Sequence, residues 1–284
     1  MDYRAGVQRI VAAHERAQRP DRTKLQPCAF AAELWRQAAV ERCRPKSQPA
    51  MTKPPTDNRS RLRPRYVAVL GAAGGLGQGI LTVCRDEGIG FTAIVRSRPE
   101  RITNVPSGSR VAVVTSLADR SALTAAFAGA DAVLAALGVT ATSRDPSALL
   151  SANMDTVEQA MVDAGVDRIV VINTLLTSLP GKPANLPMRL FSWMPGTIGR
   201  GAREQQSVVD AIGRGAFSSR RWTLVRGGLN ARGSDEHPVA SADWAGAANS
   251  WMPVSYRAMG RWMLEEAAAN EFVRAAPLVS RRRR

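Results

Sequence analysis

Three glycines spaced as G-x-x-G-x-x-G mark the stretch of this chain best suited to binding chemistry. Gly71, Gly74 and Gly77 follow directly on the run Tyr66 to Leu70, whose apolar composition is typical of a buried parallel strand. Apolar residues then recur at helical spacing over residues 76–87. A helix that begins directly after a tight turn offers unpaired backbone N–H groups and the positive end of its dipole, which together bind phosphate. The stretch therefore predicts the phosphate-binding turn of a dinucleotide site.

Each glycine of this turn has an expected task. Gly71 lets the chain leave the strand sharply, Gly74 removes a Cβ where a pyrophosphate approaches the backbone, and Gly77 lets the helix pack close to the sheet. The cofactor-binding residues predicted in the turn are Gly71, Ala73, Gly74, Gly75, Leu76 and Gly77. The competing interpretation is an ordinary strand, turn and helix built from small residues.

Two arginines follow the next apolar run, residues 91–95. In a parallel sheet the residues directly after each strand face the ligand, and an acidic side chain there usually binds the ribose hydroxyls of NAD. Arg96, Ser97 and Arg98 stand at this place instead, and guanidinium groups bind phosphate through charge-assisted hydrogen bonds. We therefore expect NADP(H) as the cofactor. Solvated surface arginines are the competing interpretation.

The other strand ends extend the predicted site. Thr115, Ser116 and Leu117 are expected to flank the adenine. Beside the phosphates and the nicotinamide ribose we expect Leu137, Gly138 and Val139. At the nicotinamide we expect Asn173, Thr174 and Leu175. Thr174 is also the catalytic candidate, because its hydroxyl can donate a hydrogen bond to a substrate. A strand-end hydroxyl that bonds the backbone is the competing interpretation for this threonine.

These residues need a framework that brings several strand ends to one edge. Strands are predicted at residues 66–70, 91–95, 111–114, 132–136, 168–172 and 222–225. Helices are predicted at residues 76–87, 121–128, 147–164, 203–212 and 255–269, and residues 272–279 are expected to add a short edge strand. Such alternation implies right-handed crossovers. The predicted fold class is α/β, a Rossmann-type doubly wound parallel sheet in a single main domain.

The charge of the chain is concentrated at its ends. Of the formal net charge of +15, residues 1–65 contribute 15 basic against 6 acidic residues, and residues 281–284 are four arginines. We expect residues 1–64 to form a basic, Pro/Arg-rich extension that is poorly ordered or partly helical, residues 65–280 to form the NAD(P)-binding domain, and residues 281–284 to be a basic tail. The predicted domain is nearly neutral, so nucleic acid is not an expected partner.

The glycine turn resembles that of the extended and atypical short-chain dehydrogenases/reductases. It is most similar to the turns of the NmrA-like and the flavin reductase (biliverdin reductase B-like) NAD(P)H-binding proteins. Further segments resemble these proteins in the same order, namely residues 91–96, 130–138, 164–174 and 222–227. The resemblance spans residues 65–279 and implies a Rossmann domain that binds NADP(H).

The resemblance leaves the chemistry open. Tyrosine-dependent members of that group use a Tyr-x-x-x-Lys pair to exchange a proton with a carbonyl oxygen, but Tyr256 is followed four residues later by Gly260. One function is an NADPH-dependent oxidoreductase that transfers a hydride to a conjugated or aromatic small-molecule acceptor, such as a flavin, quinone or polycyclic ketone. The alternative is a non-catalytic NADP(H)-binding redox sensor of NmrA type that acts through a protein partner. Residues 179–203 are expected either to line an apolar acceptor pocket or to form a partner surface.

Several other classes are disfavoured. Cys28, Cys43 and Cys84 give no disulfide framework for a chain of 284 residues, which favours a reducing, cytoplasmic location. His14 and His237 lack neighbouring ligands, so no metal is expected. No apolar run approaches the ~20 residues that span a bilayer, so a membrane is not an expected partner either.

Overall fold

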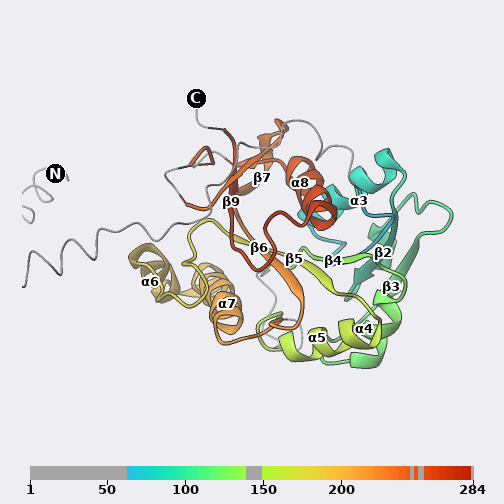
Figure 1. Cartoon of the computed structure of the whole chain (residues 1–284), viewed down its shortest axis with the longest axis horizontal. Helices are drawn as coiled ribbons and strands as arrows, with labels where there is room; N and C mark the ends of the chain where they lie inside the picture. The colour runs from blue at the N-terminus through green and yellow to red at the C-terminus, as the bar shows by residue number, and fades with distance from the viewer. Residues whose placement is uncertain (1–62, 139–148, 244–245, 249–252, 283–284) are drawn as a thin grey trace, which may run out of the picture. The chain divides into compact units, whose positions relative to one another are not determined.

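The computed structural model describes residues 63–138, 149–243, 246–248 and 253–282 (Figure 1). The chain divides into two units, residues 1–54 and 55–284, and every described residue belongs to the second. The expectation for the extension 1–64 therefore lies outside the described residues, except at residues 63 and 64. Arg63 belongs to the domain, because its guanidinium pairs with Glu87 and lies 3.1 Å from Oε1 of Glu265.

An eight-stranded sheet forms the centre of the domain, in the order β3-β2-β1-β4-β5-β6-β9-β8. Its strands are β1 (Tyr66–Leu70), β2 (Gly90–Val95), β3 (Arg110–Val113), β4 (Ala132–Ala135), β5 (Arg168–Thr174), β6 (Arg221–Gly227), β8 (Val239–Ser241) and β9 (Leu278–Ser280). All neighbouring strands are parallel except β8, which runs antiparallel to β9. The order 3-2-1-4-5-6 of the first six strands is that of the doubly wound Rossmann fold, which confirms the predicted fold class.

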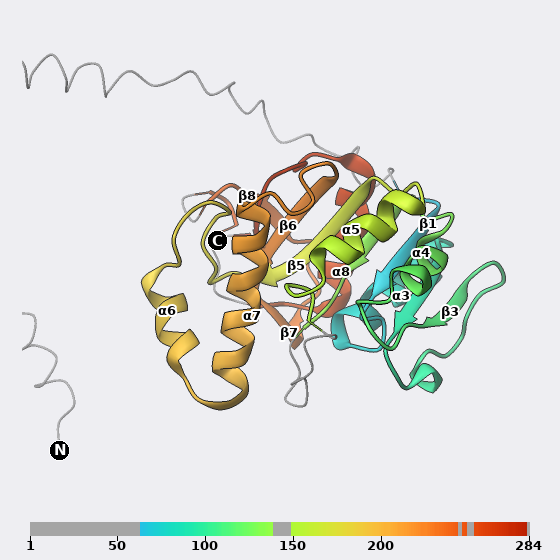
Figure 2. The same cartoon turned by 90° about the horizontal axis from the view of Figure 1, so that it is seen from below.

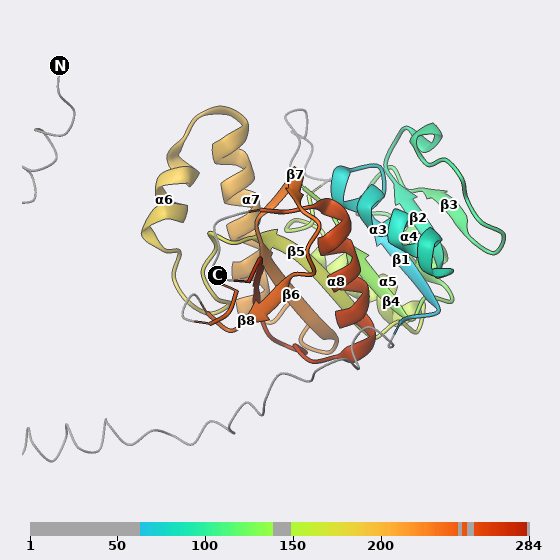
Figure 3. The same cartoon turned by 90° about the horizontal axis from the view of Figure 1, so that it is seen from above.

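Helices cover both faces of this sheet (Figures 2 and 3). They are α3 (Gly75–Glu87), α4 (Arg120–Phe127), α5 (Met154–Asp163), α6 (Leu186–Trp193), α7 (Gly196–Gly213) and α8 (Tyr256–Ala269). Apolar residues of α3 and α8 form one core cluster with the sheet, whereas those of α4, α5 and α7 form a second cluster with its other face. Strand side chains alternate between these two cores, so both faces of the parallel strands are buried.

Two predicted boundaries and one predicted position are wrong. The helix expected from residue 147 begins at Met154, and residues 147 and 148 lie outside the described part. Glu204 holds the turn before Met154, because its Oε1 accepts a hydrogen bond from the Ser151 N–H at 3.0 Å. The helix expected at residues 203–212 begins earlier, at Gly196. Strand β9 is not at the edge, because β8 pairs with its outer side.

Within the described ranges, the elements not expected from the sequence include α6, β8 and a strand β7 (Leu229–Ser234) that lies outside the main sheet. The early start of α7 also went unpredicted, because glycine is a poor helix former. At Gly199, a Cβ would lie 1.8 Å from the carbonyl oxygen of Met194. The tight passage from α6 to α7 therefore requires glycine for close packing, which helical propensity does not report.

Helix α8 is fixed firmly against α3 and the sheet. A Cβ on Gly79 would lie 2.5 Å from the Tyr256 carbonyl oxygen, and one on Gly260 would lie 2.9 Å from the Ile80 nitrogen, so two glycines allow the close helix contact. On the sheet side, the fully buried Arg168 lies 2.9 Å from Oε1 of Glu266. Burial lowers the pKa of Arg168 to about 10. These contacts hold the first residue of α8 beside the glycine turn.

Candidate active site

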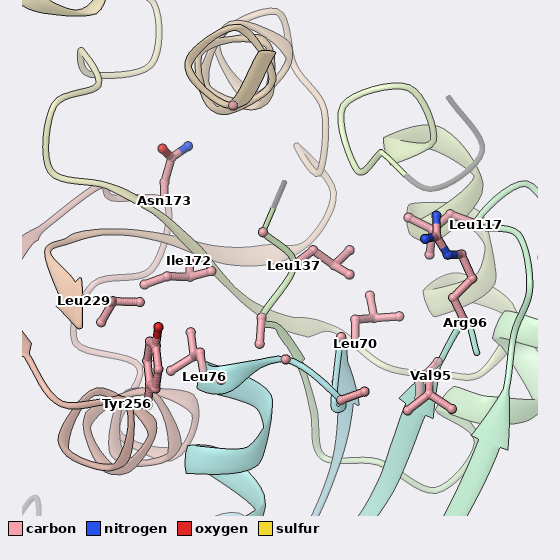
Figure 4. Close-up of a pocket in the computed structure, with 18 of the residues that line it drawn as sticks. Leu70, Leu76, Val95, Arg96, Leu117, Leu137, Ile172, Asn173, Leu229 and Tyr256 are labelled. Atoms are coloured by element: carbon pink, nitrogen blue, oxygen red, sulfur yellow. The ribbon is translucent and has the colours of Figure 1, made fainter. Parts of the chain in front are cut away.

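A pocket of about 630 Å³ opens at the carboxyl ends of the parallel strands (Figure 4). This is the place where doubly wound sheets bind ligands, at the point where the strand order reverses between β1 and β4. The residues lining it are Leu70, Gly71, Ala73, Gly74, Gly75, Leu76, Ile94, Val95, Arg96, Ser97, Val114, Thr115, Leu117, Ala136, Leu137, Gly138, Ile172, Asn173, Thr174, Gly201, Gln205, Gly227, Leu229 and Tyr256.

The glycine turn forms one wall of the pocket. Gly71 has φ +79°, a left-handed conformation that favours glycine, and its N–H and that of Ala72 both donate to the carbonyl oxygen of Ile94 at 3.1 Å. A Cβ on Gly71 would also lie 2.9 Å from the Ala136 carbonyl oxygen. The strand-to-helix turn is therefore fixed by backbone bonds to the neighbouring strand, and only glycine fits its first position.

The start of α3 is free to bind an anion. Gly74 is the N-cap and no side chain caps it, and the first turn carries no acidic residue. The N–H groups of Gly75 and Leu76 have no acceptor among the described residues. A Cβ on Gly74 would meet only the Gly71 carbonyl oxygen, at 3.3 Å, so the space beyond Gly74 is open to a ligand. Unpaired donors, the helix dipole and the missing side chain together fit a pyrophosphate.

Gly77 acts inside the turn rather than in the pocket. A Cβ there would lie 2.3 Å from the carbonyl oxygen of Gly71 and 2.6 Å from Cα of Ala72. The sequence predicts close packing of the helix against the sheet, but the close neighbour is the backbone of the turn itself. Gly77 does not line the pocket, so it shapes the site without facing a ligand.

Arg96 and Ser97 line the pocket at the end of β2. Arg96 is exposed, and Figure 4 places its guanidinium near Leu117. Arg98 does not line the pocket; it has φ 60° and precedes the short 3-10 helix Pro99–Arg101. The turn after β2 therefore presents Arg96 and Ser97 to a ligand and leaves Arg98 outside.

Of the three residues predicted just after β3, two line the pocket and Ser116 does not. Leu117 lines the pocket together with Thr115. Ser116 does not, because it lies between two inward residues and its Oγ accepts from the Ala118 N–H at 3.1 Å. This hydrogen bond stabilises the turn that follows the strand. The hydroxyl of Thr115 is the polar group that this strand end offers instead.

Leu137 and Gly138, directly after β4, line the pocket together with Asn173 and Thr174 at the end of β5, whereas Leu175 does not. Beside Thr174, the buried Asn173 organises the end of β5: its Nδ2 donates to the Gln205 carbonyl oxygen at 3.0 Å, and its Oδ1 accepts from the Thr174 N–H at 2.6 Å. The Thr174 hydroxyl has no hydrogen-bond partner among the described residues. It is therefore free to bond a ligand.

Tyr256 is the functional candidate that sequence reasoning missed. It is the first residue of α8, where Ser255 is the N-cap and accepts from the Ala258 N–H at 3.0 Å. Its half-buried ring packs so tightly on Gly75 that a Cβ there would lie 2.5 Å from Cε2. Figure 4 shows the hydroxyl pointing toward Ile172 and Leu229. No described residue bonds this hydroxyl.

Tyr256 has a further distinction within the pocket. Among the lining residues, the titratable side chains are those of Arg96 and Tyr256, and arginine does not give up its proton in proteins. Tyr256 is thus the lining side chain that can donate a proton. The rule that strand ends carry the site could not find it, because Tyr256 begins a helix that follows no parallel strand directly. The sequence did contain one indication: serine is a preferred N-cap residue, so Ser255 predicts that the helix begins at the next residue, Tyr256.

Helix α7 contributes Gly201 and Gln205 to the pocket, and neither was predicted. Oε1 of Gln205 is buried without a hydrogen-bond partner among the described residues. Of residues 179–203, Gly201 alone lines the pocket, whereas Phe191 and Trp193 are exposed at 39% and 88%. The expectation that these aromatic side chains line an acceptor pocket is therefore not met.

The described ranges contain neither a metal site nor a membrane-spanning helix. No group of three or more His, Cys, Asp and Glu side chains there could hold a metal ion. None of the described helices is long and apolar enough to cross a bilayer. Cys84 is an unpaired thiol in the core, and its burial raises its pKa to about 12, so it is a poor nucleophile. Val139 and the other residues of 139–148 lie outside the described part.

Solved structures share this fold at low sequence identity. A candidate NADH-flavin reductase from Streptococcus pneumoniae TIGR4 superposes with a TM-score of 0.58 at 18% identity, covering 77% of this chain and 100% of its own. An anaerobillin reductase from Escherichia coli O157:H7 superposes with a TM-score of 0.55 at 14% sequence identity. The match covers 76% of this chain and 96% of the reductase. A candidate exported protein from Burkholderia pseudomallei superposes with a TM-score of 0.54 at 22% sequence identity. The match covers 76% of this chain and 98% of that protein. No curated protein matches the chain significantly.

The family model agrees with the geometry of the site. The model described as NAD(P)H-binding matches residues 71–243, which begin at the first glycine of the turn and include the ends of β2 to β6. The match covers well over half of the chain and nearly all the strand ends that line the pocket. The chain belongs to the NAD(P)H-binding family.

Proposed function

We propose that this protein is an NADPH-dependent reductase that transfers a hydride to a conjugated or aromatic acceptor. The observation that carries the proposal is the course of one pocket. It runs from Arg96 at the end of β2, past the open start of α3, to an apolar end with Ile172, Leu229 and the hydroxyl of Tyr256. One end suits a phosphorylated nucleotide, and the other suits a flat apolar ring beside a proton donor.

The preference for NADPH is proposed from Arg96. Its exposed guanidinium stands where an acidic side chain would bind the ribose hydroxyls of NAD, and the residues lining the pocket include no aspartate or glutamate. A 2′-phosphate placed there would accept charge-assisted hydrogen bonds from Arg96 and a further bond from Ser97. Arg98 does not line the pocket and is not assigned to this phosphate.

The chain's own residues orient the reactants and supply the proton. When bound, NADPH supplies the hydride, which carries two electrons to the acceptor. Asn173 holds the end of β5 through its bonds to Thr174 and Gln205, and the free hydroxyl of Thr174 bonds the nicotinamide or the acceptor. Tyr256 donates a proton to the acceptor atom that gains negative charge, and solvent then reprotonates the tyrosine. The apolar side chains Ile172 and Leu229 exclude water from this end.

A conjugated acceptor suits a site in which the hydroxyl groups of Thr174 and Tyr256 have no described lysine beside them. Two structural neighbours are described as reductases, one of flavins and one of anaerobillin, which supports the class of reaction. An acceptor that delocalises the incoming charge needs less help from an acid than an isolated ketone does. A site without a lysine to activate its tyrosine therefore favours flavins, quinones or polycyclic ketones over simple carbonyl compounds.

The test is NADPH oxidation by the full chain with a flavin, a quinone and a polycyclic aromatic ketone, each compared with an isolated aliphatic ketone. We expect turnover with at least one conjugated acceptor and a Kd for NADPH below that for NADH. A Tyr256→Phe variant should bind NADPH normally and turn over more slowly. Tight NADPH binding without oxidation by any acceptor would overturn the reductase proposal and favour the non-catalytic redox sensor.

We also propose a cytoplasmic location. The support is Cys84, which remains a free thiol in the core, as is usual in a reducing compartment. One structural neighbour is described as an exported protein, which argues against a cytoplasmic location. Fractionation of the native host would decide, since recovery of the chain outside the cytoplasm would overturn the proposal.

A further inference from the structure

Helix α6 turns its apolar stripe toward solvent. Leu186, Leu190 and Trp193 recur at i, i+4 and i+7 and are 68%, 63% and 88% exposed, whereas Met188 is buried on the opposite side at 1%. An amphipathic helix of a globular domain normally buries such a stripe against the core. The exposed stripe of α6 therefore needs an explanation beyond the folding of this domain.

The exposed apolar surface continues beyond the helix. Phe191 and Met194 are each 39% exposed, and Ile198 at the start of α7 is 54% exposed. Helices α6 and α7 lie side by side at one edge of the domain, far from β3 at the other edge (Figures 2 and 3). We call residues 179–203 the α6–α7 hairpin. An exposed apolar surface of this extent on a domain edge marks an interaction site.

The charge of the hairpin identifies the kind of partner. No acidic residue occurs from residue 168 to residue 203, while the hairpin carries Lys182, Arg189, Arg200 and Arg203. Lys182 and Arg189 are exposed and form no ion pair with a described residue. Arg120, by contrast, pairs within the chain, because it lies 2.6 Å from an oxygen of Asp163. Because no described carboxylate pairs with Lys182 or Arg189, these two cations are available to the anions of a partner.

We propose that the α6–α7 hairpin binds the surface of an anionic membrane. The stripe of α6 enters the boundary between headgroups and acyl chains, where tryptophan is favoured, and the flanking cations contact lipid phosphates. A second copy of the chain is a poor occupant, because a two-fold contact would bring the same cationic surfaces together. No described helix is long and apolar enough to span a bilayer, but a helix that lies in the interface needs no such length. The proposal does not rest on the reductase function.

The experiment is cosedimentation of the full chain with phosphatidylglycerol/phosphatidylcholine vesicles and with pure phosphatidylcholine vesicles. We expect binding to the anionic vesicles only, weakened by salt. Replacing both Trp193 and Leu190 by serine should lower the partition coefficient at least tenfold, because the apolar contribution is lost. Replacing Lys182 and Arg189 by glutamine should weaken binding by a similar factor. All four side chains are exposed, so these variants should keep the wild-type melting temperature.

Matched variants separate the hairpin from the general positive charge of the chain. Arg214→Gln with Arg232→Gln removes two charges from exposed positions elsewhere, and Val113→Ser removes an apolar side chain that is 51% exposed on β3. Both should bind vesicles like the wild type. The proposal fails if the wild type does not bind anionic vesicles, or if the hairpin variants bind as well as these controls. It also fails if the hairpin variants instead dissociate a dimer or abolish binding to an acidic protein.

Discussion

At the end of the pocket nearest α3 a ligand meets mainly backbone, whereas at the end nearest α8 it meets side chains. The first end offers the unpaired N–H groups of Gly75 and Leu76, with Arg96 beyond them. The second is walled by apolar side chains and offers the hydroxyls of Thr174 and Tyr256. The two ends lie in one pocket, but they control different steps.

Because of this difference, substitutions at the two ends should change different properties of the protein, namely cofactor affinity at one end and turnover at the other. At the backbone end, the turn is fixed by hydrogen bonds to β2 and by missing Cβ atoms, so an added side chain blocks the ligand. At the side-chain end, a hydroxyl can be removed without moving the backbone. Changes at the first end should therefore alter cofactor affinity, and changes at the second should alter turnover at unchanged affinity.

The largest expected effect is that of Gly74→Val at the backbone end. The branched side chain occupies the space open to the pyrophosphate, and its Cβ would meet only the Gly71 carbonyl oxygen, at 3.3 Å. We expect NADPH affinity to fall more than a hundredfold while the domain stays folded. Titration of intrinsic fluorescence with NADPH measures the loss. An affinity within a few fold of the wild type would contradict the assignment of the turn.

Two controls separate loss of the ligand from loss of the fold. Thr82→Val introduces the same side chain into α3 away from the pocket and should bind NADPH normally. Alkylation of Cys84, followed by peptide mapping, reports on the packing of α3, because burial raises the pKa of this thiol to about 12. Cys84 should stay protected in Gly74→Val. Rapid labelling there would attribute the lost affinity to unfolding instead.

Arg96→Ala should have the next largest effect and sharpens the same comparison. Loss of a charge-assisted contact to a 2′-phosphate costs on the order of 1.5–3 kcal/mol, which is roughly a tenfold to hundredfold loss of NADPH affinity. NADH affinity should barely change. Arg98→Ala is the matched control, because this arginine does not line the pocket. If Arg96→Ala lowers the affinities for NADPH and NADH equally, Arg96 is a surface residue that does not contact the 2′-phosphate.

The backbone end is also the end that could be predicted from the sequence. Glycines at Gly71, Gly74 and Gly77 report backbone geometry directly, and the strand ends that follow them fall at one edge of any parallel sheet. Tyr256 and Gln205 come instead from helices whose position depends on packing. Tyr256 reaches the pocket because Gly79 and Gly260 allow close contact between α3 and α8, and no local pattern specifies such a contact between residues so far apart in sequence.

Tyr256→Phe tests the side-chain end. The substitution keeps the ring that packs on Gly75 and removes a hydroxyl that no described residue bonds, so stability and NADPH affinity should be unchanged. We expect kcat to fall about tenfold with a flavin or quinone and further with a less conjugated ketone, because proton donation matters more there. The solvent deuterium isotope effect should change with it. A fall in NADPH affinity at constant kcat would show that the tyrosine binds the cofactor instead.

Thr174→Val has the smallest expected effect and is the strictest test of the comparison. Valine keeps the shape of threonine, and the bond from the backbone N–H of residue 174 to Oδ1 of Asn173 remains. Since a neutral hydrogen bond contributes about 0.5–1.5 kcal/mol, kcat/KM should fall roughly threefold to tenfold, with the melting temperature unchanged. Thr177→Val is the opposite control, because the buried Thr177 hydroxyl donates to the Thr174 carbonyl oxygen at 2.9 Å and does not line the pocket. That variant should lose stability and leave the catalytic rate of the folded protein close to that of the wild type. If Thr174→Val lowers the melting temperature as Thr177→Val does and leaves turnover unchanged, the Thr174 hydroxyl is structural and the chemistry at this end rests on Tyr256.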